Sequence, residues 1–191
     1  KNLSVQVLEE LHNQNFTIKG VLTRDHEKSM KMWLKDLGHK SLKTEAERLG
    51  IPVYEKISIN SSTFQKLFSD LDIDFAVGVF WGEIIKEKIL NLARLGFFNL
   101  HTALLPRNRG SFPMAWPIIN GEKHAGITFP KMATGVDNGP ILGQKKVLIG
   151  EADTGATLYS KVTEAGVELF REILPSIADS TFSLKPQNES Q

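Results

Sequence analysis

The chain has 191 residues, of which 41% are apolar, and it carries 23 Lys and Arg against 22 Asp and Glu, with no Cys. This length can bury a full hydrophobic core as one domain, and a formal net charge of +1 excludes a whole-molecule field that would attract nucleic acid or membranes. The lack of Cys excludes a thiol nucleophile, a disulfide framework and thiolate metal ligands. No apolar run approaches the roughly 20 residues that cross a bilayer, so we expect a cytoplasmic protein without a membrane partner.

Apolar spacing in the first half of the chain alternates between the helical and the strand period. The expected helices cover residues 3–11, 41–49, 62–71 and 83–91. The expected strands cover residues 16–23, 51–54, 73–80 and the segment around Phe97. Ser41 and the Ser62–Gln65 pair are of the types that cap helix N-termini, and the run at 73–80 suits a strand covered on both faces. This order predicts an α/β fold, a Rossmann-like three-layer sandwich with a mostly parallel sheet.

The second half of the chain has a different pattern. Residues 125–129 and 141–149 have the composition of strands joined through the turn-rich segment 135–140, so we expect this half of the sheet to be partly antiparallel. A helix should follow Asp153 and Thr154 and continue until Pro175. An α/β sheet normally begins with a strand, whereas this chain begins in a helical pattern. We therefore expect the first strand to lie upstream of Lys1.

The candidate site begins where the Phe97 strand ends. Asn99 and His101 are two residues apart, so on an extended backbone their side chains point to the same side. The carboxyl ends of parallel strands are where open α/β sheets bind ligands. A lone Asn or His at a strand end is more often satisfied by nearby backbone, but a Pro-containing basic loop follows these two and favours a functional site.

Four separated blocks carry a family resemblance. They are Asn99-x-His101, Ala103-Leu104-Leu105-Pro106-Arg107-Asn108-Arg109-Gly110, Gly126-Ile127-Thr128 and Gly135-Val136-Asp137-Asn138-Gly139-Pro140-Ile141-Leu142. In this order they resemble the signature of the folate-dependent formyltransferases, a family that includes methionyl-tRNA formyltransferase, glycinamide ribonucleotide formyltransferase and sugar N-formyltransferases. The resemblance implies a catalytic domain over residues 1–180 and a polar tail over 181–191 that can begin a C-terminal extension.

By this resemblance, Asn99, His101 and Asp137 form the catalytic trio, and 10-formyltetrahydrofolate is the formyl donor. Formyl transfer to an amine passes through a tetrahedral carbon with a negative oxygen. Asn99 can donate to that oxygen, and the loss of one such donor costs about 10²- to 10³-fold in rate. His101 can carry the proton, and Asp137 can orient its ring. Alternatively, Asp137 belongs to an ordinary Asp-Asn-Gly-Pro turn.

The resemblance also implies contacts with the donor from three segments. These residues are Trp81, Glu83, Ile84 and Ile85, then Ala103, Leu104, Leu105, Pro106 and Ser111, then Ala133, Thr134, Gly135 and Val136. Trp81 can equally be a core aromatic residue. Ser111 stands where some sugar-modifying relatives carry an Arg.

Basic residues suggest where anionic groups could bind. Arg107 and Arg109 can grip a phosphate or carboxylate of a substrate, or they can tie down their own loop, and both alternatives stand. A second basic group is formed by Lys28, Lys31, Lys35, His39, Lys40 and Lys43, and it is either a solvated face or a contact for a nucleotide or tRNA. The sequence has no His-Glu-x-x-His motif and no carboxylate cluster, so we expect no metal.

These patterns predict an N-formyltransferase that acts on a small-molecule amine. An amino sugar carried on a nucleotide is the first expectation for the acceptor, and methionyl-tRNA is the second. A formyltetrahydrofolate hydrolase and a non-catalytic folate- or nucleotide-binding module are the remaining alternatives. A homodimer is compatible with the sequence, which contains no feature that decides the oligomeric state.

Overall fold

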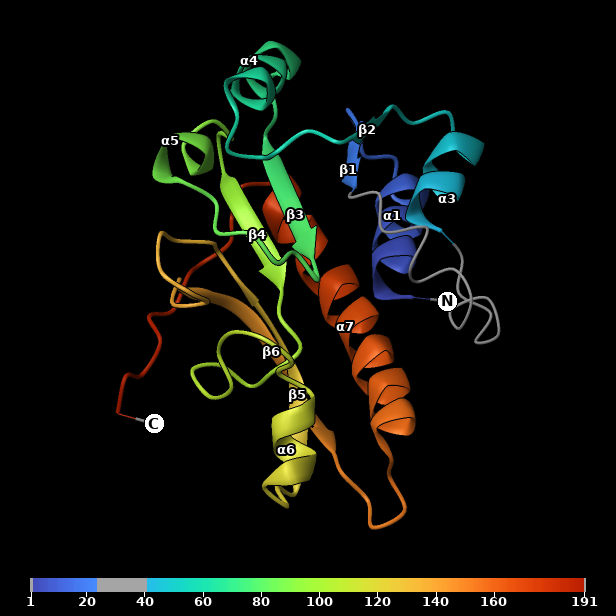
Figure 1. The fold of residues 1–191 in the computed structure, drawn as a ribbon, viewed down its shortest axis with the longest axis vertical. Coiled ribbons are helices and arrows are strands. Elements are labelled where there is room, and N and C mark those ends of the chain that lie inside the picture. Colours follow the sequence, from blue (N-terminus) through green and yellow to red (C-terminus); the bar gives the residue numbers. More distant parts are fainter. Residues whose placement is uncertain (1, 24–40, 191) are drawn as a thin grey trace. The chain divides into compact units, whose positions relative to one another are not determined.

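A computed structural model of the chain describes residues 2–23 and 41–190, and the chain divides into two compact units, residues 1–72 and 73–191 (Figure 1). Each unit alternates helices with strands. The strand pairs are parallel in the first unit and at the start of the second, and an antiparallel hairpin follows. The predicted Rossmann-like α/β class is therefore confirmed.

The first unit is built on one parallel strand pair. Its elements are α1 (Leu3–Asn13), β1 (Val21–Thr23), α3 (Leu42–Arg48), β2 (Val53–Glu55) and α4 (Ser62–Leu71). Val21 of β1 pairs with Val53 of β2, and a small core of Leu8, Val21, Ala46 and Ile51 joins the strands to α1 and α3. Ser41 caps α3 as predicted, with its side chain accepting from the Thr44 N–H.

Two boundaries in the first unit differ from the sequence prediction. Strand β1 covers only the last three residues of the predicted run at 16–23. The cap of α4 is Ser61 rather than Ser62, since the Ser61 hydroxyl accepts from the Phe64 N–H at 3.1 Å. Two adjacent serines have equal capping propensity, so the sequence pattern alone cannot choose between them.

The second unit contains the strands on which the candidate site is built. Its elements are β3 (Phe75–Val79), α5 (Glu87–Leu90), β4 (Gly96–Leu100), α6 (Ala115–Ile119), β5 (His124–Pro130), β6 (Ile141–Leu148) and α7 (Gly155–Ala178). Strand β4 is parallel to β3, and antiparallel bridges at Phe98–Lys131 and His101–Thr128 place β5 on its other side. Strand β6 then pairs antiparallel with β5.

The core of the second unit is aromatic. Phe98 of β4 stacks on Phe129 of β5 with ring centroids 5.3 Å apart, and Phe170 of α7 meets Phe129 edge-on at 5.7 Å. Figure 1 shows α7 running beside the β5–β6 hairpin that it packs against. Every residue of β4 is buried, so the strand that carries Asn99 is fixed on both faces.

Helix lengths in the second unit also differ from the predictions. Helix α5 is a single turn, Glu87–Leu90, because residues 80–86 form an irregular loop after β3. Helix α7 continues past Pro175 to Ala178. Pro175 is exposed, its carbonyl still accepts from the Asp179 N–H at 3.0 Å, and buried Leu174 and Ile177 hold the chain on either side. Packing therefore offsets the missing proline donor.

The segment after α7 is extended and packed. Phe182 meets Phe98 edge-on with centroids 5.7 Å apart. Lys185 exchanges both backbone hydrogen bonds with Ile141, at 2.7 and 2.9 Å. Residues 182–189, which we call the C-terminal arm, therefore run along the start of β6 beside the turn that contains Asp137.

Candidate active site

The end of β4 holds Asn99 and His101 in a buried, rigid setting. The backbone of His101 exchanges hydrogen bonds with Thr128 of β5 at 2.9 and 2.8 Å, which fixes the residue just beyond the strand. The two residues are only 7% and 6% exposed. Because they are two apart on an extended backbone, both side chains reach the same place, as the sequence spacing predicts.

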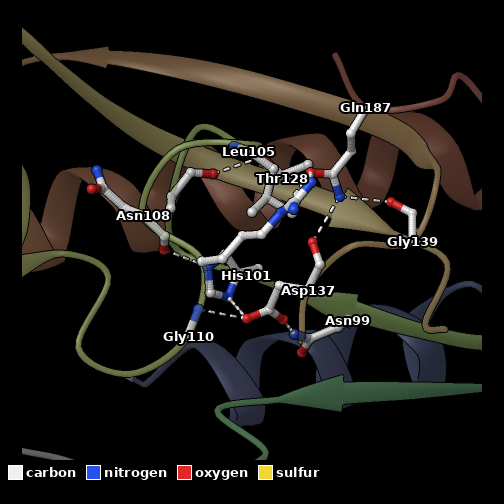
Figure 2. Close-up of polar contacts among 11 residues, drawn as sticks. Asn99, His101, Leu105, Asn108, Gly110, Thr128, Asp137, Gly139 and Gln187 are labelled. Carbon is white, nitrogen blue, oxygen red and sulfur yellow. Dashed lines mark hydrogen bonds and ion pairs between the residues drawn. The ribbon is translucent and has the colours of Figure 1, made fainter. Parts of the chain in front are cut away.

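Asp137 meets both of these side chains (Figure 2). Its Oδ1 lies 3.5 Å from Asn99 Nδ2, and its Oδ2 lies 3.6 Å from His101 Nδ1. The backbone N–H of Gly110 donates to Oδ2 at 2.9 Å. The structure thus brings Asp137 to Asn99, 38 residues away in the sequence, and to His101, so that one carboxylate lies between an amide and an imidazole.

The imidazole of His101 has a defined orientation. Its Nε2 lies 3.1 Å from the carbonyl oxygen of Asn108, which can only accept, so Nε2 carries a hydrogen and donates it. Nδ1 is therefore the ring nitrogen that faces Asp137 and the site. A proton on Nδ1 makes the ring an imidazolium paired with the carboxylate, and without that proton Nδ1 is a base.

Two polar side chains, Thr128 and Gln144, hold the loop that follows His101 through hydrogen bonds. Thr128 Oγ1 donates to the Ala103 carbonyl at 2.6 Å and accepts from the Leu105 N–H at 3.1 Å. Gln144 of β6 donates to the Leu105 carbonyl and to Thr128 Oγ1, at 2.9 and 2.8 Å. The peptide bond before Pro106 is cis. This loop carries the Asn108 carbonyl and the Gly110 N–H to His101 and Asp137.

The turn that contains Asp137 requires a glycine at position 139. A Cβ on Gly139 would lie 1.8 Å from the backbone oxygen of Lys131, far inside van der Waals contact. Asp137 itself has φ of +46°, in the left-handed region that Asp tolerates better than most residues. The turn therefore folds back tightly on the end of β5, and this places the Asp137 carboxylate over the end of β4.

The predicted donor-binding residues fall on loops of the second unit. Ile84 and Val136 expose more than half of their surface, and Thr134, Gly135 and Ser111 are also exposed. Ile85, Ala103 and Leu105 are buried, so their side chains serve the core. The remaining predicted residues, Trp81, Glu83, Leu104, Pro106 and Ala133, are partly buried.

The two loop arginines have different surroundings. Arg107 is largely exposed, and its Nη1 lies 3.9 Å from a carboxylate oxygen of Glu122. Arg109 is bound to the C-terminal arm through Gln187 and Glu189. The hydrogen-bonded Glu189 carboxylate raises the pKa of Arg109, and Arg109 in turn lowers the pKa of Glu189. In this structure the Arg109 guanidinium is hydrogen-bonded to the C-terminal arm, and substrate binding by Arg107 and Arg109 stays a prediction.

Two residues in the surroundings of the site were not anticipated from the sequence. Gln144 supports the loop after His101, and Gln187 donates to backbone carbonyls of the Asp137 turn. Gln144 lies on an otherwise regular strand, and Gln187 stands in a polar segment without periodicity. Neither has a local sequence signal, because their partners lie on other segments of the chain.

Most of the predicted basic group falls on residues 24–40, outside the part of the chain that the structure describes. Lys28, Lys31, Lys35, His39 and Lys40 lie outside the described residues. Lys43 lies inside them and forms an ion pair with Glu55 of β2. Within residues 2–23 and 41–190, no group of three or more His, Asp or Glu side chains is placed to hold a metal ion. No helix in the same part of the chain has the length and apolar character needed to span a membrane.

The fold and the site together define an α/β protein with an amide donor, an imidazole and a carboxylate converging at the end of a central strand, an arrangement suited to acyl transfer. The formyl transferase family model matches residues 2–174, and the chain belongs to this family.

A curated relative of this chain is consistent with the family assignment. A methionyl-tRNA formyltransferase of Macrococcus caseolyticus is 38% identical over 150 residues, which are 78% of this chain and 48% of the relative. The chain therefore spans about half the length of that curated relative.

Solved structures also share the fold. A phosphoribosylglycinamide formyltransferase of Anaplasma phagocytophilum superposes with a TM-score of 0.80 at 20% identity, covering 99% of this chain and 91% of that one. An N-formyltransferase of Helicobacter canadensis, solved with folinic acid and dTDP-3-aminofucose, has a TM-score of 0.77 at 25% identity, with coverages of 98% and 65%.

Proposed function

We propose that the protein transfers a formyl group from 10-formyltetrahydrofolate to a primary amine, with Asn99, His101 and Asp137 as the catalytic residues. The observation that carries this proposal is the position of Asp137, whose two carboxylate oxygens lie against the Asn99 amide and His101 Nδ1 at 3.5 and 3.6 Å. Membership in the formyl transferase family supports the reaction class.

The residues present fit the folate donor. The buried Oδ1 of Asn99 has no hydrogen-bond partner in the described part of the chain, which is the state expected of an atom that meets a ligand. Exposed Ile84 and Val136 offer apolar contacts to a flat pteridine ring. When bound, 10-formyltetrahydrofolate supplies the formyl carbon that is transferred. The segments that would hold it are 81–85, 103–106 with Ser111, and 133–136.

Asn99 acts on the oxygen of the formyl group. Its Nδ2 carries two hydrogens, and Asp137 Oδ1 takes at most one of them, at 3.5 Å. The other can be donated to the oxygen as negative charge develops there. Because the side chain is held on a fully buried strand, the donor is fixed in place before reaction, which is what makes such a contact effective.

His101 transfers the proton of the attacking amine. With Nε2 anchored to the Asn108 carbonyl, Nδ1 accepts the proton that the attacking amine gives up and passes it to the departing nitrogen. Asp137 Oδ2 stabilises the imidazolium formed in between. Direct attack by the amine needs no covalent bond to the enzyme, which is consistent with a chain that has no Cys.

Two acceptors are supported by different observations. An amino sugar on a nucleotide agrees with the likeness to the Helicobacter canadensis structure that contains dTDP-3-aminofucose. Methionyl-tRNA agrees with the 38% identity to a methionyl-tRNA formyltransferase, a higher identity than that of the sugar enzyme. The catalytic residues act on a primary amine in either case.

The test is a panel of acceptors with one donor. Tetrahydrofolate formation is followed by absorbance with 10-formyltetrahydrofolate and, in separate reactions, several amino sugar nucleotides, methionyl-tRNA and glycinamide ribonucleotide. We expect one class to be formylated, as verified by mass spectrometry of the product. Release of formate without any acceptor would identify a hydrolase. Folate binding without turnover of any amine would identify a binding module, and either result overturns the proposal.

A further inference from the structure

The C-terminal arm is anchored so that one side chain reaches the Asp137 turn. Phe182 packs against the core at Phe98, and the backbone of Lys185 pairs with Ile141 at the start of β6. These two contacts leave little freedom for the next residues. Gln187 consequently lies directly over the turn, two residues beyond the paired Lys185 (Figure 2).

The amide of Gln187 uses all of its hydrogen-bonding capacity at this place. Its Nε2 donates to the backbone carbonyls of Asp137 and Gly139, each at 2.7 Å. Its Oε1 accepts from Nε and Nη2 of Arg109 at 3.1 and 2.6 Å. An amide has two donor hydrogens and two acceptor lone pairs, so every one is occupied.

Gln187 therefore connects the two loops that meet at the site. Arg109 immediately precedes Gly110, whose N–H holds Asp137 Oδ2 at 2.9 Å. On the other side, the bonded carbonyls belong to Asp137 itself and to the buried Gly139. Glu189 also holds the Arg109 side chain in place, because its two carboxylate oxygens accept from Nη1 and Nη2 of Arg109 at 3.1 and 2.7 Å.

The Asp137 backbone needs such support. A non-glycine residue at φ of +46° keeps that conformation only where its neighbours hold it there. Bonds to its own carbonyl and to that of Gly139 fix the direction of the turn, and with it the position of the carboxylate relative to His101 Nδ1.

We propose that Gln187 is a positioning residue that sets the Asp137 carboxylate against His101 by joining the Arg109 loop to the Asp137 turn. The inference rests on the proposed function of Asp137 and His101. Gln187 contacts neither the Asp137 carboxylate nor the His101 ring. It acts through the backbone of the turn that carries Asp137. The residue type follows from the geometry: Glu cannot donate to two carbonyls, and Lys cannot accept from Arg109.

The test uses the whole protein with three variants. Gln187→Glu keeps the shape and the acceptor for Arg109 but replaces the donor with a charged oxygen that two carbonyls repel. Glu189→Gln is a milder change at an exposed residue, and it weakens the ion pair that Glu189 forms with Arg109. Asn188→Ala is the matched control, because the Asn188 side chain accepts only from Ser190, just after the arm, among the hydrogen bonds of the described residues.

Two readouts separate positioning from a general structural role. The first is kcat against KM for the folate donor, since displaced catalytic groups lower kcat by roughly 10- to 100-fold while donor binding is kept. The second is hydrogen exchange of the Gly110 amide together with the ¹⁵N shifts of the His101 ring. We expect Gln187→Glu to lower kcat, to accelerate exchange at Gly110 and to shift the ring signals. Glu189→Gln should do so weakly, and Asn188→Ala should not.

Specific outcomes overturn the inference. It fails if Gln187→Glu leaves kcat, Gly110 exchange and the His101 shifts at wild-type values. It also fails if exchange rises uniformly through the second unit, because that would show only lost stability. If Gln187→Glu does not fold, the same comparison is made with Glu189→Gln. If the wild type formylates no amine, the proposed function fails, and the exchange and ¹⁵N measurements still decide whether Gln187 positions Asp137.

Discussion

The backbone N–H of Gly110 and the ring nitrogen Nδ1 of His101 face the same carboxylate oxygen, Asp137 Oδ2, at 2.9 and 3.6 Å. The other oxygen of Asp137 faces the Asn99 amide at 3.5 Å. Each oxygen of the Asp137 carboxylate therefore has a donor group against it, and these contacts hold the carboxylate between the Asn99 amide and the His101 ring.

We expect Asp137→Asn to lower kcat by about 10²-fold or more, because an amide cannot stabilise the imidazolium that Nδ1 becomes when it takes a proton. Folate affinity should change little, since the predicted donor contacts lie on the segments 81–85, 103–106 with Ser111, and 133–136 and do not include the Asp137 side chain. Stopped-flow kinetics and a binding titration measure the two effects. Asp179→Asn, at the end of α7, is the control and should behave as wild type.

Asn99→Asp should reduce kcat by about 10²- to 10³-fold, the cost of removing one oxyanion donor. The replacement is nearly isosteric but has no N–H, and it places a second carboxylate beside Asp137. The melting temperature must be measured alongside, because Asn99 is buried on β4. A variant that keeps full activity would remove Asn99 from the mechanism.

We expect Gly139→Ala to destabilise the protein by about 1–3 kcal/mol, because a Cβ there would overlap the Lys131 backbone oxygen at 1.8 Å. Such a loss lowers Tm by about 2–4 °C per kcal/mol for a chain of this size. Gly155→Ala is the matched control. A Cβ at Gly155 meets nothing within 4 Å, and Ala is the better helix former at the start of α7, so its Tm should be equal or higher.

The Asp153 carboxylate predicts a pH dependence of stability. A hydrogen bond from Lys161, with further bonds from the Gly150 N–H and the Thr157 hydroxyl, lowers its pKa from 3.8 to about 2. Between these values the unfolded chain binds more protons than the folded one, so stability falls with decreasing pH. The contribution of Asp153 is complete above about pH 4 and is lost as the pH falls toward 2.

Asp153→Asn tests this dependence. Its free energy of unfolding should lie below that of the wild type at pH 7, and the gap should narrow as the pH is lowered through 4 to 2. Urea unfolding followed by circular dichroism at each pH measures the gap. A difference that stays constant over this range would show that the charge of Asp153 does not contribute.

Much of the site geometry followed from local sequence properties. The i, i+2 spacing of Asn99 and His101 on an apolar strand is enough to place both side chains on one side, as the structure has them. The Gly139 position in a tight turn is likewise a local feature. The parallel pairing of β3 with β4 and the hairpin of β5 with β6 followed from the apolar periods.

Features that depend on distant partners did not follow from the sequence. Arg109 and Gln187 are 78 residues apart, and no spacing rule connects them. Helix α7 passes Pro175 because Leu174 and Ile177 are buried, a tertiary effect that outweighs the local rule that proline ends helices. The choice of Ser61 over Ser62 as the cap of α4 depends on backbone angles that two adjacent serines do not reveal.

The most direct test of the account compares two histidines of the second unit in the same tetrahydrofolate-formation assay. His101 lies in the site, whereas His124 lies at the start of β5 and pairs with Leu148 through its backbone. We expect His101→Ala to abolish formyl transfer while folate binding is kept, and His124→Ala to turn over as wild type. Formyl transfer by His101→Ala at the wild-type rate would contradict it.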